Sequence, residues 1–154
     1  MNETNDGNAI LEALRTLSKD QHLALRAVCS EVEQYYDTLS GIYVDLSSEW
    51  LVQPRKPDGT PRVVSLRNEH LLSLGTGLDR DIPVIICDTA NHPAFANWNQ
   101  NNRWFFAVAS LKSRSGIRYA RLGMVGKDPR PDFGLNDADF LMASIKRVAE
   151  ILKI

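Results

Sequence analysis

Six residues in the second half of the chain are of the types that a small-molecule site requires. They are Asp88, His92, Asn97, Trp98, Arg103 and Phe106. A pocket for a small molecule combines apolar walls, which provide burial, with a few polar groups that fix the orientation of the ligand. The charged, amide and imidazole side chains of this set could supply the polar groups, and its two aromatic rings could supply a wall. The sequence therefore predicts that these six residues bind a ligand, whose identity it does not give.

Two of the six also have a simpler interpretation that needs no ligand. Asp88 lies shortly before a short helix predicted at residues 94–98, so its carboxylate could cap that helix or close an Asx turn. His92 precedes Pro93, which favours extended backbone, and a lone histidine there is more often a turn residue than a metal or haem ligand. Both interpretations stay open, and no metal site is predicted.

Arginines gather around the last two predicted strands, and they suggest the charge of a ligand. They are Arg103, Arg114, Arg118 and Arg121. On a hairpin, some of them could converge to hold a phosphate or a carboxylate. The alternative is that they are solvated strand and turn residues paired with nearby acids. The cluster is therefore only a hint of an anionic ligand.

Catalytic motifs are not visible in the sequence. It contains no nucleophile elbow, zinc-protease helix motif, P-loop or dinucleotide-binding glycine pattern. Cys29 falls in a helical pattern and Cys87 in an apolar run, and neither has a CxxC partner. Both are predicted to be small buried residues in a reducing compartment. We therefore expect no enzymatic activity, and the cofactor, if there is one, is unknown.

The composition indicates one packed domain with no general attraction to polyanions. The chain has 154 residues, 44% of them hydrophobic and 24% charged, which are ordinary values for a globular domain. The formal net charge is -1, so neither nucleic acid nor an anionic membrane is an expected partner. The polar N-terminus has no secretion signal, and no apolar stretch is long enough to span a bilayer. We expect a cytoplasmic protein.

Helical periodicity appears at both ends of the chain. Residues 1–8 are predicted to be disordered, and apolar residues then recur at helical spacing over 9–39, as one helix or as two joined near Ser18. Residues 136–153 give the clearest helix, with Asn136 as the N-cap and acidic residues in the first turn. A single domain is therefore expected over residues 9–154.

Strand patterns fill the region between these helices. They cover residues 42–46, 50–53, 62–66, 83–87, 104–111 and 117–125, and a short helix is predicted at 68–74. Hairpins are expected between 50–53 and 62–66 and between 104–111 and 117–125. The continuous apolar run at 83–87 predicts a strand that is central or well covered, and Gly41 is expected to end the first helical region. The order of elements predicts an α+β fold with a largely antiparallel sheet.

Residues 83–152 resemble the C-terminal half of a GAF domain of the bacterial signalling kind. Four segments carry the resemblance through their order and spacing: Pro83–Asp88 followed by His92–Ala96, Arg103–Leu111, Gly116–Val125, and Asp128–Pro131 ahead of Asn136–Asp139. The resemblance implies a GAF/PAS-like sheet of five or six antiparallel strands, with the N- and C-terminal helices packed on one face. It also implies a pocket on the other face, with residues 66–103 as its roof.

The resemblance implies a sensory domain that binds a small molecule and signals through its terminal helices. Bilin-binding members of the family need an attachment cysteine that is commonly followed by histidine, which neither cysteine here provides. The alternative is a ligand-free module for dimerisation or partner binding, because the apolar stripe over 25–39 could pair with a second chain. The expected partners are a small molecule, a second copy of the chain through its helices, and a downstream signalling domain or protein.

Overall fold

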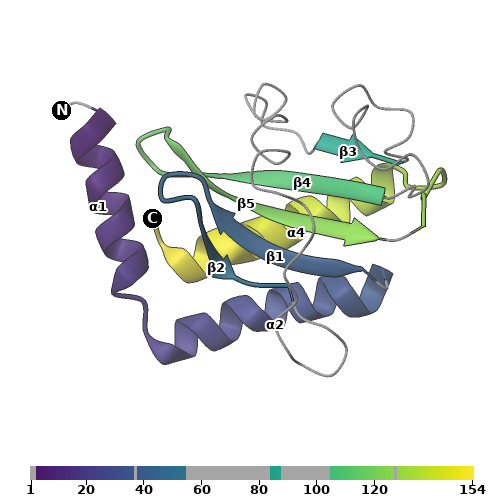
Figure 1. Ribbon diagram of the computed structural model, residues 1–154, viewed down its shortest axis with the longest axis horizontal. Helices are drawn as coiled ribbons and strands as arrows, with labels where there is room; N and C mark the ends of the chain where they lie inside the picture. Colours follow the sequence, from purple (N-terminus) through teal and green to yellow (C-terminus); the bar gives the residue numbers. More distant parts are fainter. Residues whose placement is uncertain (1–2, 37, 55–83, 88–104, 127) are drawn as a thin grey trace.

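The computed structural model describes residues 3–36, 38–54, 84–87, 105–126 and 128–154. Within these residues, helices stand at the two ends of the chain and antiparallel strands come between them in sequence (Figure 1). In chain order the elements are α1 (Glu3–Arg15), α2 (Lys19–Tyr36), β1 (Leu39–Val44), β2 (Glu49–Val52), β3 (Val84–Ile86), β4 (Phe105–Lys112), β5 (Arg118–Gly126) and α4 (Leu135–Leu152). The α+β class with an antiparallel sheet, predicted from the sequence, is confirmed.

The described strands form one sheet in the order β2-β1-β5-β4-β3. Each neighbouring pair is antiparallel, and β1 and β2 form a hairpin. The strand predicted at 83–87 therefore lies at an edge of the described sheet and not in its centre, because an apolar run indicates burial without saying which neighbour provides it. The strand predicted at 62–66 and the helix predicted at 68–74 lie outside the described residues.

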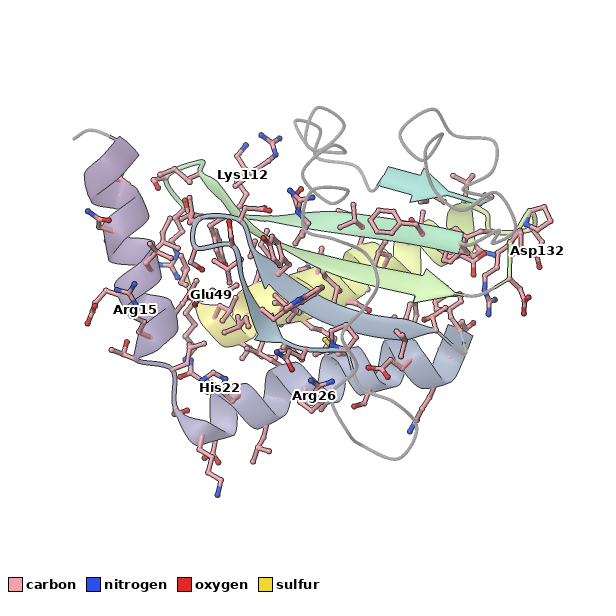
Figure 2. The ribbon with its side chains drawn as sticks, viewed as in Figure 1. Arg15, His22, Arg26, Glu49, Lys112 and Asp132 are labelled. Atoms are coloured by element: carbon pink, nitrogen blue, oxygen red, sulfur yellow. The ribbon has the colours of Figure 1, made fainter. Side chains whose placement is uncertain are left out.

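The N-terminal helical region is divided in two at Ser18. The Ser18 hydroxyl accepts a hydrogen bond from the Gln21 amide at 3.1 Å, and the Gln21 side chain accepts one from the Ser18 amide at 2.9 Å. This reciprocal capping starts α2 afresh and turns the chain between the helices. Figure 2 shows Arg15 and His22 on the two sides of this bend. The first helix, α1, begins at Glu3, within the segment that the sequence predicts to be disordered.

The α2 and α4 helices lie side by side and run in opposite directions under one face of the sheet (Figure 1). Near the start of α2, the side-chain amide of Gln21 donates a hydrogen bond of 3.0 Å to the backbone carbonyl of Ile151, close to the end of α4. The apolar stripe of α2 is buried against this core through Leu25, Val28, Val32 and Tyr36. Among the described residues the stripe therefore covers the protein's own sheet. The other use considered for it from the sequence was pairing with a second chain.

Gly41 lies inside β1, although the sequence predicts that it ends a helix. The α2 helix ends at Tyr36, and β1 begins at Leu39. A Cβ atom at Gly41 would come within 2.7 Å of the Val52 carbonyl oxygen and of Pro54 Cδ. Glycine is required here because the chain after β2 passes directly over the backbone of β1, a tertiary contact that local sequence signals do not encode.

The predicted hairpin near the end of the chain is confirmed by β4 and β5. Its turn has Gly116 at φ 94°, a left-handed conformation that glycine adopts without strain. Alternation along β4 places Phe105 in the core between sheet and helices, and Phe106 on the other face.

The α4 helix begins one residue earlier than predicted and uses a different cap. Gly134 is the N-cap, and its amide donates to Asp137 Oδ2 at 2.9 Å, whereas Asn136 lies within the helix. The carboxylate in the first turn therefore does the capping that the sequence assigned to Asn136.

Candidate functional site

The sheet has a second face, directed away from α2 and α4, that also carries buried side chains. The register of the strands assigns to it Gly41 and Tyr43 of β1, Trp50 of β2, Phe106, Val108 and Ser110 of β4, and Arg121 and Gly123 of β5. Tyr43, Phe106, Val108 and Arg121 are all at most 4% exposed. In the GAF-like layout predicted from the sequence, this is the face that would carry a pocket.

A row of polar and aromatic residues crosses four strands on the second face. The register pairs Trp50 with Tyr43, Tyr43 with Arg121, and Arg121 with Ser110. Directly opposed residues in antiparallel strands have Cβ atoms about 5 Å apart, so neighbours in the row are in contact range. The rings of Tyr43 and Trp50 meet edge to face, with centroids 5.2 Å apart. We call these four residues the cross-strand row.

A buried ion pair stands at the centre of the cross-strand row. Arg121 Nη2 lies 2.7 Å from Asp45 Oδ1, and Asp45 directly follows β1. The Arg121 side chain is 5% exposed and that of Asp45 is 21% exposed, so the pair is largely removed from water. Burial raises the pKa of the Asp45 carboxyl above its usual range, while the attraction to Arg121 opposes the rise. Removing two charges from water costs desolvation free energy. An ion pair on this face therefore indicates that the face does more than form an apolar core.

The hydroxyl of Tyr43, the residue in register with Arg121, is buried, and no hydrogen-bond partner for it exists among the residues that the structure describes. Buried hydroxyls are almost always paired with protein or with water. The Tyr43 hydroxyl is thus available to a further group on the second face.

A second polar cluster joins the ends of α2 and α4 to β3. The Tyr36 hydroxyl donates to Asp137 Oδ1 at 2.9 Å, and the Arg130 guanidinium donates to the Tyr36 carbonyl. Arg130 also lies over the Tyr36 ring, 5.4 Å from its centroid, and its amide donates to the Cys87 carbonyl at 2.9 Å. We call Tyr36, Arg130 and Asp137 the helix-end junction. It connects the two core helices to the residue that follows β3.

A polar contact also joins α2 to the end of β2. Arg26, which Figure 2 shows on α2, donates to the carbonyl of Gln53 and lies 3.7 Å from Glu33. The α2 helix is therefore held at its middle by the residue after β2 and at its end by Arg130.

Of the six residues predicted from the sequence to bind a ligand, Phe106 is the one that the structure describes. It is 1% exposed and lies on the second face, in register with Val125 of β5. The other five lie outside the described residues: Asp88, His92, Asn97, Trp98 and Arg103. Among the predicted arginines, Arg121 lies on the second face, Arg114 is exposed in the hairpin turn, and Arg118 is half-buried at the start of β5.

Tyr43 and Asp45 are not among the residues predicted from the sequence to form the site. Alternation along β1 directs Tyr43 to the other face of the sheet from Ile42 and Val44. This pattern indicates that Tyr43 lies outside the main core. Nothing in the local sequence pairs Asp45 with Arg121, because the pairing depends on the register of β1 against β5.

The two cysteines have different environments. Cys29 is fully buried in α2, and burial raises the pKa of its thiol to about 12. Cys87, predicted to be buried, is only partly so, because it follows an edge strand. In the part of the chain that the structure describes, no group of three or more His, Cys, Asp or Glu side chains could hold a metal ion. None of the described helices is long and apolar enough to cross a membrane.

The fold is similar to that of known GAF domains. Neither a protein-family model nor a curated protein matches the sequence. Among solved structures, the chain is similar to the crystal structure of the GAF domain from Acinetobacter phosphoenolpyruvate-protein phosphotransferase, with a TM-score of 0.59 and 17% sequence identity. The alignment covers 99% of this chain and 94% of that chain. The chain therefore has a GAF-like fold, as the resemblance of residues 83–152 predicts.

Proposed function

We propose that this GAF-like chain is a regulatory domain that binds a small molecule on the second face of its sheet and signals through α2 and α4. The observation that carries the proposal is the cross-strand row, which places a buried ion pair and a buried hydroxyl on the face opposite the helices. A face that served only as core would be expected to carry apolar side chains at these positions, because each buried polar group must be compensated. Phe106 and Val108 provide the apolar surface beside the row.

The helix-end junction supports a route from the second face to the helices. Cys87 immediately precedes residues 88–103, which hold five of the six predicted ligand-binding residues. Its carbonyl is held by the Arg130 amide, and the Arg130 side chain holds the end of α2. A ligand that moves the chain after β3 would therefore act on the ends of α2 and α4 through a short series of hydrogen bonds.

We further propose that the domain is not catalytic and that it is cytoplasmic. Cys29 is held as a neutral thiol by burial, and a thiol in that state is a poor nucleophile. Both cysteines are free, as expected in a reducing compartment.

An alternative function is a ligand-free module that forms a homodimer or binds a downstream signalling partner through its helices. Two exposed apolar residues favour it: Tyr35 of α2 is 66% exposed and stacks on Phe140 of α4, and Met142 of α4 is 38% exposed. Such residues are typical of helical interfaces, although isolated exposed apolar residues are also normal on monomers.

Native mass spectrometry of the protein purified from its host distinguishes the two functions, since it reports the number of subunits and any retained small molecule together. A retained molecule supports the sensory function. A dimer without a small molecule supports the alternative, whereas a bare monomer contradicts the homodimer and gives no support to the sensory function. Hydrogen exchange with and without the retained molecule then tests the signalling route. The amides at the end of α2 and the start of α4 should change protection on binding, and unchanged protection there would contradict the route.

A further inference from the structure

Arg121 places a positive charge on a buried face of the sheet, beside apolar residues of β4. Ser110 lies directly opposite it on β4, Val108 is the next residue of β4 on the same face, and Phe106 lies two residues beyond Val108. At the end of the same hairpin, Lys112 pairs in register with Arg118 (Figure 2 shows Lys112 there). Three cationic residues thus lie along one hairpin, and Arg121 is the one that belongs to the cross-strand row.

Gly123 lies on β5, two residues along the same face from Arg121, and no residue that the structure describes fills the space above its backbone. The backbone does not require glycine there, since the positive φ among the glycines belongs to Gly116. A Cβ atom at Gly123 would come no nearer than 3.9 Å to an atom of the described residues, the Ala107 carbonyl oxygen and Val108 Cγ2. Glycine in the middle of a strand weakens the strand and often marks a place where a ligand approaches the backbone closely.

The cross-strand partner of Gly123 shows that the two glycines have different roles. Gly41 is paired with Gly123 in register, but a Cβ there would collide with Pro54 and with the backbone of β2. Packing explains Gly41, whereas neither packing against the described residues nor backbone conformation explains Gly123.

We infer that the second face binds a small molecule through an anionic oxygen group, a carboxylate or a phosphate, seated at Tyr43 and Arg121, with the rest of the molecule passing over Gly123. The guanidinium and the phenol both donate hydrogen bonds to such a group, and arginine matches the geometry of carboxylate and phosphate oxygens. Asp45 holds the guanidinium in position from the end of β1. The apolar body of the molecule lies against Phe106 and Val108. This inference rests on the proposed function and adds to it the chemical class of the ligand.

Ligand-observed fluorine NMR with three probes tests the inference directly. The probes are para-fluorobenzoate, para-fluorophenyl phosphate and the neutral para-fluorobenzyl alcohol, which share one apolar ring. The variants are Gly123→Ala, which fills the space above β5, and Tyr43→Phe, which removes only the hydroxyl. Tyr35→Phe is the matched control, because Tyr35 is exposed on the helical side. Circular dichroism and thermal unfolding establish that each variant is folded before it is titrated.

At millimolar concentration, at least one anionic probe should bind the wild-type protein, and the alcohol should bind at least about tenfold more weakly. Which anion binds tells a carboxylate ligand from a phosphate ligand. Gly123→Ala should weaken binding of that anion by about tenfold, Tyr43→Phe should weaken it several-fold, and Tyr35→Phe should leave it unchanged.

Binding of the alcohol as tight as that of the anions would overturn the inference, and so would unchanged anion binding in folded Gly123→Ala. Failure of both anions to bind would overturn it as well. A neutral molecule retained in native mass spectrometry and lost in Gly123→Ala would overturn the anionic class while leaving the proposed function in place. A bare protein with no affinity for any probe would contradict both.

Discussion

The phenol of Tyr36, at the end of α2, donates a hydrogen bond of 2.9 Å to Asp137 Oδ1 in the first turn of α4. The other oxygen of the same carboxylate caps α4 by accepting from the Gly134 amide. One side chain therefore closes the start of α4 and fastens it to the neighbouring helix. Burial and the bond to Asp137 both raise the pKa of the Tyr36 hydroxyl above its ordinary value, so the donor stays protonated in alkaline solution as well as at neutral pH.

Tyr36→Phe should lower the free energy of unfolding by about 1.5 kcal/mol, because the bond accepted by a carboxylate is lost while the ring contacts remain. Denaturant unfolding measures the change. Tyr35→Phe is the matched control and should change stability by less than about 0.5 kcal/mol, since that side chain is 66% exposed. A double-mutant cycle with Asp137→Asn should give a coupling energy of at least about 0.5 kcal/mol. Additive effects would mean that the bond does not form in solution.

Gly41→Ala should be strongly destabilising, by about 2 kcal/mol or more, because its Cβ would lie 2.7 Å from the Val52 carbonyl oxygen and from Pro54 Cδ. Gly123→Ala, on the neighbouring strand, should change stability by less than about 1 kcal/mol in the absence of ligand. Thermal or denaturant unfolding of both variants makes the comparison. Equal losses would show that the space above Gly123 is filled by other parts of the chain.

Asp45→Ala should cost about 3 kcal/mol, because it leaves the charge of Arg121 buried without its carboxylate. The double variant Arg121→Met with Asp45→Leu should recover most of the loss, since it removes both charges and keeps apolar volume. The exposed pair of Arg147 and Glu31 provides the control, and Glu31→Ala should cost no more than about 1 kcal/mol. Denaturant midpoints measure all three. A single variant as mild as the control would show that solvent reaches the Arg121 pair freely.

Cys87 should react with a thiol reagent in the native protein, whereas Cys29 should react only after unfolding, because Cys29 is completely buried in α2. Counting modified thiols before and after adding denaturant measures this. Two thiols that react at equal rates in the native state would contradict the buried position of Cys29.

The raised pKa of Cys29 also predicts a loss of stability in alkaline solution. The thiol ionises near pH 8.5 in the unfolded chain and near 12 in the folded one, so between these values the unfolded state releases a proton that the native state keeps. Unfolding is therefore favoured as pH rises, by up to about 1.4 kcal/mol for each pH unit above about 8.5. The stability advantage of the wild type over Cys29→Ala should shrink accordingly. A constant difference up to pH 11 or so would contradict the shift.

Local patterns in the sequence were sufficient for much of the secondary structure. In α2, apolar residues recur at helical spacing from Leu25 to Tyr36, and in β4 and β5 buried residues alternate between the two faces of the sheet. Each segment repeats its pattern over several residues, so the local pattern agrees with the secondary structure that the segment adopts. The glycine in the turn at Gly116 marks a hairpin for the same local reason. The GAF-like fold is predicted separately, from the resemblance of four segments within residues 83–152 to a GAF domain.

Only the tertiary structure decided where the polar groups of the second face would lie. The register of β1 against β5 brings Tyr43 beside Arg121, and the end of β1 delivers Asp45 to the same guanidinium. The passage of Pro54 over β1 explains Gly41, and contact with Tyr36 explains why the carboxylate of Asp137 matters beyond its own helix. These relations join residues far apart in the chain, and such pairings are selected by the burial energy of the whole sheet and its helices. A local sequence pattern indicates which residues lie outside the core, but the partner that each of them contacts depends on strand register and on helix packing.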